Sequence, residues 1–277
     1  MSRLVVEMKN KLIYYETKYK REGERMKTVS VRNIKIGEGM TKICVPILGK
    51  TKEEIISFAK KVKELAVDLV EWRADWFEDV LDEKKVEELL LELRAIVEDM
   101  PILYTYRTVR EGGNGAADKE VYVTLNQKVC DMGIVDLIDV EMFSGEDIIK
   151  EIIDYAHEKN VIVVGSNHDF GGTPSQKQLV TRLQLMQHFK ADIIKIAVMP
   201  NTKKDVIALL LATEEMVTKY AKCPVVSMSM SKMGVFSRIS GELFGSAMTF
   251  ASAGIASAPG QIPVEEMKMI LELMSQE

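Results

Sequence analysis

Cysteine is scarce in this sequence, with three residues among 277, and none of them has a partner at C-x-x-C spacing. Cys44, Cys130 and Cys223 therefore indicate neither a zinc site nor a disulfide framework. Unpaired thiols are typical of proteins in a reducing compartment, so we expect a cytoplasmic protein.

Long apolar runs are also missing. No stretch reaches the roughly 20 apolar residues of a membrane span, and no signal peptide opens the chain, so we expect no membrane association. The formal net charge is −5, which argues against general affinity for nucleic acid. No P-loop and no G-x-G-x-x-G motif follows a predicted strand, which disfavours a nucleotide cofactor. An apolar content of 47% still predicts a well-filled globular core.

Residues 1–25 differ from the rest of the chain. They carry seven basic and four acidic residues, a net charge of +3 in a chain that is negative overall. Their mixed pattern indicates either a short amphipathic helix or a disordered leader. Because a new pattern starts at Met26, this residue is a candidate alternative initiation site. We therefore predict a leader over 1–25 and one catalytic domain over 26–277.

From Lys42 onward, short runs rich in β-branched residues alternate with helical segments. Residues 28–39, before this region, alternate apolar and polar side chains around Arg32-Asn33, which predicts a β-hairpin. Eight βα units in succession predict a (β/α)₈ TIM barrel, an α/β fold whose bottom the hairpin would close. The predicted strands are 42–47, 68–73, 101–107, 135–142, 160–168, 191–198, 223–230 and, more weakly, 246–251. The predicted helices are 51–66, 82–98, 119–132, 145–158, 175–189, 202–220, 237–243 and 263–275.

One predicted strand, 191–198, carries a lysine in its apolar centre, Lys195. Burial disfavours a charged ammonium group, and a neutral lysine is an amine nucleophile that forms Schiff bases with ketones. Taken alone, the strand leaves an alternative open, in which the lysine reaches the strand end or pairs with a carboxylate.

Polar residues gather where the predicted strands end, which is where the active sites of (β/α)₈ barrels lie. Any one of them taken singly fits a structural ion pair, but their collection indicates a pocket with convergent charge. They include Glu71, Arg73, Arg107, Glu111, Asp139, Glu141, Asn167, His168, Lys195 and Arg238.

Of the three histidines, only His168 directly follows a predicted strand, next to the strand that holds Lys195. It is a candidate general base, whereas His157 and His188 lie near helix ends and are expected at the surface. A single histidine in the pocket disfavours a metal site. Lysine and histidine together suggest imine chemistry with proton transfer.

Three arginines, Arg73, Arg107 and Arg238, would oppose positive charge on the lysine and bind a carboxylate or phosphate. From the residues alone, we expect an imine-forming lyase or aldolase that acts on an anionic ketone.

Six motifs resemble those of type I 3-dehydroquinate dehydratase. The resemblance runs from about Met26 to the C-terminus. It implies a (β/α)₈ barrel, usually a homodimer, that dehydrates 3-dehydroquinate to 3-dehydroshikimate without metal or other cofactor. That reaction belongs to the shikimate pathway, which leads to chorismate and the aromatic amino acids. The motifs are VEWRAD (70–75), YRTVREGG (106–113), SNHDF (166–170), KIAVMP (195–200), MSMS (228–231) and SAPGQI (257–262).

The resemblance also implies roles for the catalytic residues. Lys195 would form the Schiff base with the substrate ketone. His168 would remove the proton beside the imine carbon, assist formation and hydrolysis of the imine, and pass the proton to the departing hydroxyl. Glu111 would orient His168 and sustain its basicity.

Six further residues would bind the substrate by the same resemblance. Arg238 would bind the carboxylate. Ser257 and Gln261, on a loop after the last strand, would close over the substrate as a hinged lid. The ring hydroxyls would be held by Glu71, Arg73 and Arg107.

One departure from the family pattern is Gly171-Gly172, where a bulkier and more polar pair is expected. Two glycines would loosen this loop. Two alternatives remain beside the dehydratase. A class I aldolase would need a phosphate cradle near the last strands, and MSMSKMGVFSR (228–238) offers one arginine and no clear cradle. A binding protein that has lost turnover would be expected to lack Lys195, His168 or Glu111. From the length, we expect no fusion with shikimate dehydrogenase.

Overall fold

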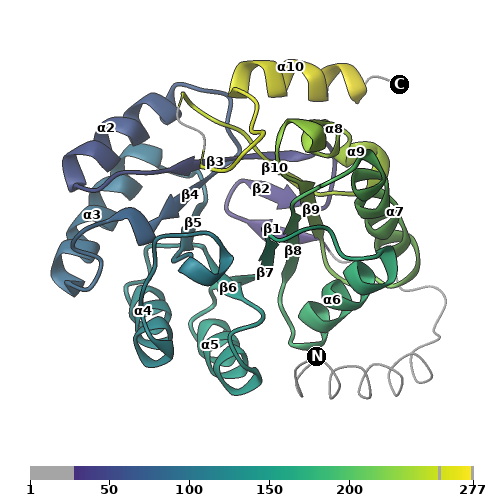
Figure 1. The fold of residues 1–277 in the computed structure, drawn as a ribbon. Helices are drawn as coiled ribbons and strands as arrows, with labels where there is room; N and C mark the ends of the chain where they lie inside the picture. Colours follow the sequence, from purple (N-terminus) through teal and green to yellow (C-terminus); the bar gives the residue numbers. More distant parts are fainter. Residues whose placement is uncertain (1–27, 255–256, 276–277) are drawn as a thin grey trace.

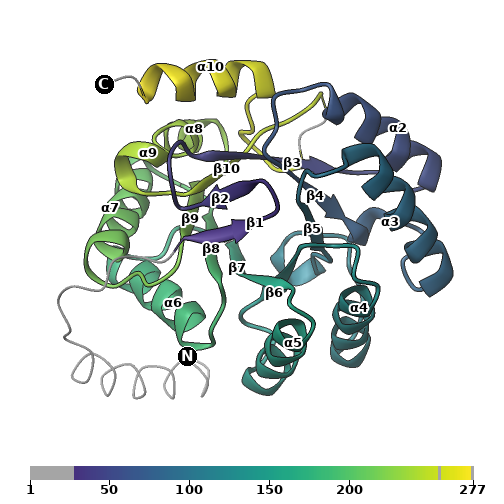
Figure 2. The same ribbon diagram turned by 180° about the vertical axis from the view of Figure 1, so that it is seen from behind.

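The centre of the molecule is a ring of eight parallel strands surrounded by helices, as Figures 1 and 2 show from opposite sides. The structure is a computed structural model that describes residues 28–254 and 257–275, so the predicted leader over 1–25 lies outside it. The strand order β10-β3-β4-β5-β6-β7-β8-β9 confirms the predicted (β/α)₈ barrel. The strands are β3 (Lys42–Ile47), β4 (Leu69–Arg73), β5 (Ile102–Thr105), β6 (Leu137–Glu141), β7 (Ile162–Asp169), β8 (Ile193–Val198), β9 (Val225–Ser229) and β10 (Met248–Phe250).

The helices pack their apolar faces on the outside of the ring. Helix α2 begins after Thr51, whose side chain accepts a hydrogen bond from the Glu54 backbone N–H. The long helices are α2 (Lys52–Lys63), α3 (Glu83–Val97), α4 (Lys119–Asp131), α5 (Glu146–Glu158), α6 (Gln176–His188), α7 (Lys203–Lys219) and α10 (Val264–Met274).

The predicted helix 237–243 is wrong in extent. The chain instead forms a 3₁₀ turn, Lys232–Gly234, and two short helices, α8 (Val235–Ile239) and α9 (Gly241–Phe244). The helix breaks at Ser240, whose hydroxyl donates to the Phe236 carbonyl. It restarts where a Cβ on Gly241 would lie only 2.7 Å from the Ser246 carbonyl oxygen. This tight tertiary contact is not visible in the helical pattern of the sequence.

The barrel has a weak seam between β9 and β10. These strands are joined by one bridge, Val225 to Ser246, and by the hydrogen bond from the Ala247 N–H to the Val225 carbonyl at 2.8 Å. Strand β10 pairs instead with β3, which brings Met248–Phe250 beside Lys42–Cys44 and closes the ring.

The barrel interior changes from apolar to polar along the strand direction. Inward side chains alternate with outward ones, so residues two apart along a strand stand one above the other. We call the apolar layer at the N-terminal ends the floor: Cys44, Leu69, Leu103, Leu137, Val164, Ile193, Val226 and Met248. The layer above it includes Glu71, Thr105, Asp139, Ser166 and Lys195, all buried.

The predicted hairpin is present and closes the barrel bottom. Strands β1 (Val29–Val31) and β2 (Ile34–Ile36) pair antiparallel, and Figure 2 shows them across the N-terminal end of the barrel. Val31 and Ile36 are buried in one cluster with the floor. The hairpin therefore separates the floor from water.

Asp136 fastens the hairpin to the barrel wall. Its carboxylate accepts hydrogen bonds from Arg32 in the hairpin, from Arg94 in α3 and from the Ile102 backbone N–H at 2.8 Å. The Asp136 side chain is only 12% exposed. The positive charges of Arg32 and Arg94 are therefore compensated by this carboxylate more than by solvent.

We predict that Asp136→Ala lowers the free energy of unfolding by about 2–3 kcal/mol, because two partly buried arginines lose their common partner. Urea unfolding followed by circular dichroism measures this. The control is Asp99→Ala, since Asp99 also pairs with Arg32, at 3.9 Å, but is 88% exposed. We expect the control to stay within about 0.5 kcal/mol of the parent, and equal losses in both variants would contradict the role of Asp136.

Candidate active site

A cavity that is open to solvent lies at the C-terminal ends of the strands. The structure brings all the predicted site residues to its wall. Apolar side chains complete the lining, among them Phe170, Met228, Met230 and Phe250. The predicted residues are Lys195, His168, Glu111, Glu71, Arg73, Arg107, Arg238, Ser257 and Gln261. Their gathering is an observation, and their roles remain predictions.

Lys195 stands inside the barrel at the middle of β8 and is only 3% exposed. Its Nζ atom lies 3.5 Å from Glu71 Oε1 and 3.3 Å from Asp139 Oδ2. The same atom lies 4.3 Å from the centre of the Phe250 ring. The lysine is therefore both buried and paired with carboxylates, while its amine remains part of the cavity wall.

Asp139 is a site residue to which the sequence analysis gave no role. It is buried on β6 and contacts Lys195, Ser166 Oγ at 2.6 Å and Arg107 Nη2 at 2.7 Å. Although burial opposes ionisation, the positive charges of Arg107 and Lys195 lower the pKa of Asp139. The sequence did contain a signal for Asp139. It lies two residues before Glu141, so both side chains are on one face of a strand, at the predicted active-site end.

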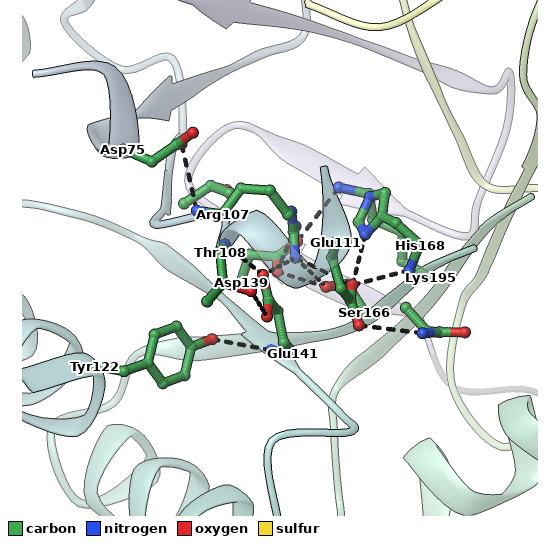
Figure 3. Close-up of polar contacts among 12 residues, drawn as sticks. Asp75, Arg107, Thr108, Glu111, Tyr122, Asp139, Glu141, Ser166, His168 and Lys195 are labelled. Carbon is green, nitrogen blue, oxygen red and sulfur yellow. Dashed lines mark hydrogen bonds and ion pairs between the residues drawn. The ribbon is translucent and has the colours of Figure 1, made fainter. Parts of the chain in front are cut away.

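Arg107, just after β5, is the centre of the buried charge network that Figure 3 shows. In addition to Asp139, it lies 3.1 Å from Glu141 Oε1 and 3.5 Å from Glu111 Oε2. It also donates to Ser166 Oγ at 3.0 Å. Most of its charge is therefore compensated by the protein, and it organises the carboxylates around the cavity.

The other two arginines differ in whether a carboxylate compensates their positive charge. Arg73 forms a two-pronged ion pair with Asp75, with both contacts at 2.8 Å. Arg238, on α8, is 1% exposed and donates to the Pro259 carbonyl at 3.1 Å. Within residues 28–254 and 257–275 it has no carboxylate partner, and burial lowers the pKa of Arg238 to about 10. A buried cation without a counter-ion is a ready receptor for an anionic ligand.

His168 is held by Glu111 at the C-terminal end of β7. Glu111 Oε2 accepts the His168 backbone N–H at 2.8 Å and lies 2.9 Å from Nδ1, as Figure 3 shows. Burial, and then the charges of Arg107 and Lys195, hold the pKa of His168 well below its usual range. The imidazole is therefore neutral at neutral pH, and a proton on Nδ1 that faces Glu111 leaves Nε2 free to accept one.

The geometry of Glu111 depends on the loop that follows β5. Glu111 ends a 3₁₀ turn, Val109–Glu111, and Gly112 follows with φ of 80°. A Cβ on Gly112 would lie 2.3 Å from the Phe170 ring, so glycine is needed for both its conformation and this close approach. Burial raises the pKa of Glu111 to about 8, while the charge of Arg107 and the hydrogen bond from Asn167 oppose this rise and favour the carboxylate that accepts from the imidazole.

The segment after β10 covers one side of the cavity. The Ser257 N–H donates to Gln261 Oε1 at 2.8 Å, and Gln261 Nε2 donates to Ser257 Oγ at 2.9 Å. The Pro259 carbonyl accepts the Ser231 N–H at 3.1 Å as well as the Arg238 guanidinium. These contacts tie the predicted lid directly to the arginine without a counter-ion.

The loop with the unusual glycine pair is anchored on both sides. The Gly171 N–H donates to Asp169 Oδ1 at 3.1 Å, and Thr173 donates to the Met199 carbonyl at 2.9 Å. A Cβ on Gly171 would meet nothing closer than 3.5 Å, and one on Gly172 would lie 3.3 Å from Asn201. Neither position requires glycine.

Among the described residues, no group of three or more His, Cys, Asp or Glu side chains is arranged to bind a metal ion. No helix in the described ranges is both long enough and apolar enough to cross a membrane.

Comparisons with known proteins agree on one family. The model of type I 3-dehydroquinase matches residues 43–277. The 3-dehydroquinate dehydratase of Clostridioides difficile is 51% identical over 246 residues, which cover 89% of this chain and 96% of that enzyme. The 3-dehydroquinate dehydratase of Salmonella agona is 48% identical over 251 residues, covering 91% of this chain and 100% of that enzyme.

Solved structures give the same result. The type I 3-dehydroquinate dehydratase from Clostridium difficile, solved with covalently modified comenic acid, superposes with a TM-score of 0.88 at 50% identity, covering 90% of this chain and 98% of that one. The 3-dehydroquinate dehydratase from Geobacillus kaustophilus gives 0.87 at 37% identity, covering 90% and 96%. The chain therefore belongs to the type I 3-dehydroquinase family, and it is a hydro-lyase that dehydrates 3-dehydroquinate through a lysine Schiff base.

Proposed function

We propose that Lys195 is the lysine that forms this Schiff base and that His168 transfers the proton. The observation that carries the proposal is the placement of a buried amine and a neutral imidazole on the adjacent strands β8 and β7. Both line one cavity. No other described lysine lines that cavity.

The reaction divides into four stages. The Lys195 amine adds to the ketone carbon of 3-dehydroquinate, and loss of water gives an iminium ion. His168 then removes a proton from the neighbouring carbon, and the iminium takes up the electron pair as an enamine. The enamine expels the hydroxyl group, which leaves as water with the proton from His168. Hydrolysis of the remaining imine frees Lys195 and 3-dehydroshikimate.

Glu111 orients the base in this scheme. Its carboxylate contacts Nδ1 of His168, so Nε2 is the nitrogen that accepts the substrate proton. As His168 becomes positively charged, the negative charge of Glu111 stabilises it. Because the site is buried, this electrostatic effect is stronger than it would be in water.

Arg238 binds the substrate carboxylate in our proposal. It is buried, it lines the cavity, and its charge has no carboxylate partner in the described part of the chain. The lid residues Ser257 and Gln261 line the same cavity, and the carbonyl of Pro259, which lies between them in the chain, accepts a hydrogen bond from Arg238. A bound carboxylate would therefore stabilise the lid over the substrate.

Glu71, Arg73 and Arg107 bind the ring hydroxyls and neighbouring groups in this proposal. Their side chains are already fixed by protein partners, namely Thr105, Asp75 and Asp139. Preorganised groups lose little conformational entropy on binding, which favours recognition of a polyhydroxylated ring.

We further propose a cytoplasmic homodimer in which residues 26–277 form one catalytic domain behind the leader 1–25. Exposed apolar side chains on the neighbouring helices α7, α8 and α9 support self-association: Ile207, Leu211, Phe236 and Leu243. Free buried thiols support a reducing compartment.

The imine is tested by borohydride reduction in the presence of 3-dehydroquinate, followed by intact mass and peptide mapping. We expect a stable adduct on Lys195, and we expect Lys195→Ala to lose both the adduct and turnover because the nucleophile is gone. The control Lys232→Ala removes an exposed lysine near the barrel rim and should keep both. Formation of dehydroshikimate by Lys195→Ala at the parental rate would refute the assignment.

The pH profile tests the base. Because the pKa of His168 is held below 6.5, by burial first and positive charges second, more acid is needed to protonate it. We expect the acidic limb of kcat/KM to have its midpoint below pH 6.5. Steady-state rates from pH 4.5 to 8 measure it. A midpoint at or above 6.5 in the parent would instead report titration of Glu111, whose pKa burial raises to about 8. An unchanged rate in His168→Ala would place the base elsewhere.

Arg238→Ala should weaken substrate binding by about 2–5 kcal/mol, because the substrate carboxylate would be buried without a partner. Arg238→Lys should lose less, since it keeps the charge but not the planar fork. Calorimetry of substrate binding to a Lys195→Ala background measures the affinity without turnover. Equal affinity in Arg238→Ala and its parent would mean that another group binds the carboxylate.

A further inference from the structure

Asn167 is a buried polar residue that the mechanism above does not use. On β7, its neighbours Ser166 and His168 point into the barrel, so Asn167 points outward. It is 7% exposed and pairs in register with Ile196, a residue of the apolar layer beneath the helices. A buried amide in such a layer is costly unless its hydrogen bonds are satisfied.

Both ends of the Asn167 amide are satisfied. Its Nδ2 group donates to Glu111 Oε1 at 3.1 Å, and its Oδ1 atom accepts from Arg182 Nη1 at 2.9 Å. Arg182, on α6, is itself held by Asp169 Oδ2 at 3.0 Å and lies over the Phe143 ring. Because a guanidinium can only donate, it fixes Oδ1 toward itself and Nδ2 toward Glu111.

Glu111 is thereby held at both carboxylate oxygens. Oε2 faces the backbone and ring nitrogens of His168, and Oε1 faces Asn167. Arg107 competes for the same carboxylate, with Nη1 only 3.5 Å from Oε2. Without Asn167, Oε1 would have no hydrogen-bond donor among the described residues, and the carboxylate would be free to turn toward Arg107 and away from the imidazole.

We propose that Asn167 and Arg182 are positioning residues for proton transfer, in which Arg182 orients the Asn167 amide and that amide holds Glu111 against His168. Neither side chain lines the cavity, so neither contacts the substrate. The inference rests on the proposed roles of Glu111 and His168, and it adds a second layer that acts through them.

The test compares Asn167→Leu, which keeps the volume and loses the hydrogen bonds, with Arg182→Met and Arg182→Lys. We expect kcat to fall about tenfold in Asn167→Leu and Arg182→Met with KM changed less than twofold. Arg182→Lys should keep most of the parental kcat. Asn167 and Asp169 both accept from one nitrogen of Arg182, which a single lysine ammonium group can replace. The control Arg110→Met removes an exposed charge beside Glu111 and should leave kcat unchanged.

Two readouts separate positioning from a general loss of structure. The borohydride adduct on Lys195 should still form in Asn167→Leu. The deuterium isotope effect on kcat, measured with substrate deuterated at the carbon that loses its proton, should rise because proton removal becomes slower. An unchanged isotope effect with lowered kcat would indicate a merely structural role and would overturn the inference.

A double-mutant cycle shows whether the effect passes through Glu111. In a Glu111→Gln background, we expect Asn167→Leu to cause no further loss of kcat, and full additivity would overturn the inference. If kcat falls in Glu111→Gln but is normal in Asn167→Leu and Arg182→Met, this inference is overturned while the proposed role of Glu111 stands. Normal turnover of Glu111→Gln would overturn the proposed role of Glu111 and this inference with it.

Discussion

Compensation of buried charge is the constraint on which this molecule depends. The cations Lys195 and Arg107 are placed inside the barrel within reach of Glu71, Asp139, Glu141 and Glu111. Removing any one member leaves an opposite charge less compensated among side chains that are almost fully buried. The network therefore fixes the geometry of the cavity, and Arg238 is the cation that the described residues leave for a ligand.

The apolar floor and the polar layer above it have separate tasks within one set of strands. The floor residues pack against Val31 and Ile36 of the hairpin, which supplies hydrophobic stabilisation and keeps water out from below. The polar side chains stand one pleat higher and open only toward the cavity. The free-energy cost of burying these polar side chains is thus offset by the hydrophobic stabilisation of a core that takes no part in the chemistry.

The sequence predicted the barrel because β-branched runs and helical segments alternate with clear boundaries, and each strand matches to within a few residues. It predicted the pocket because parallel strands bring their C-terminal ends together. It did not predict the break at Ser240 or the contacts of Asn167, since both depend on tertiary approach: of Gly241 to Ser246, and of α6 to the end of β7. Asp139 was visible as a polar residue at a strand end, but its pairing with Lys195 requires the positions of β6 and β8 around the closed ring.

The pairing of β3 with β10 has a consequence for the chain during its synthesis. Strand β3 is the first of the ring to leave the ribosome, and its partner on one side, Met248–Phe250, is the last. Until that partner emerges, the backbone N–H and C=O groups along one edge of Lys42–Cys44 have no ladder to join. An open, apolar strand edge is a template for pairing with other chains. The nascent protein thus carries an edge open to misassociation until its last strand completes the ring.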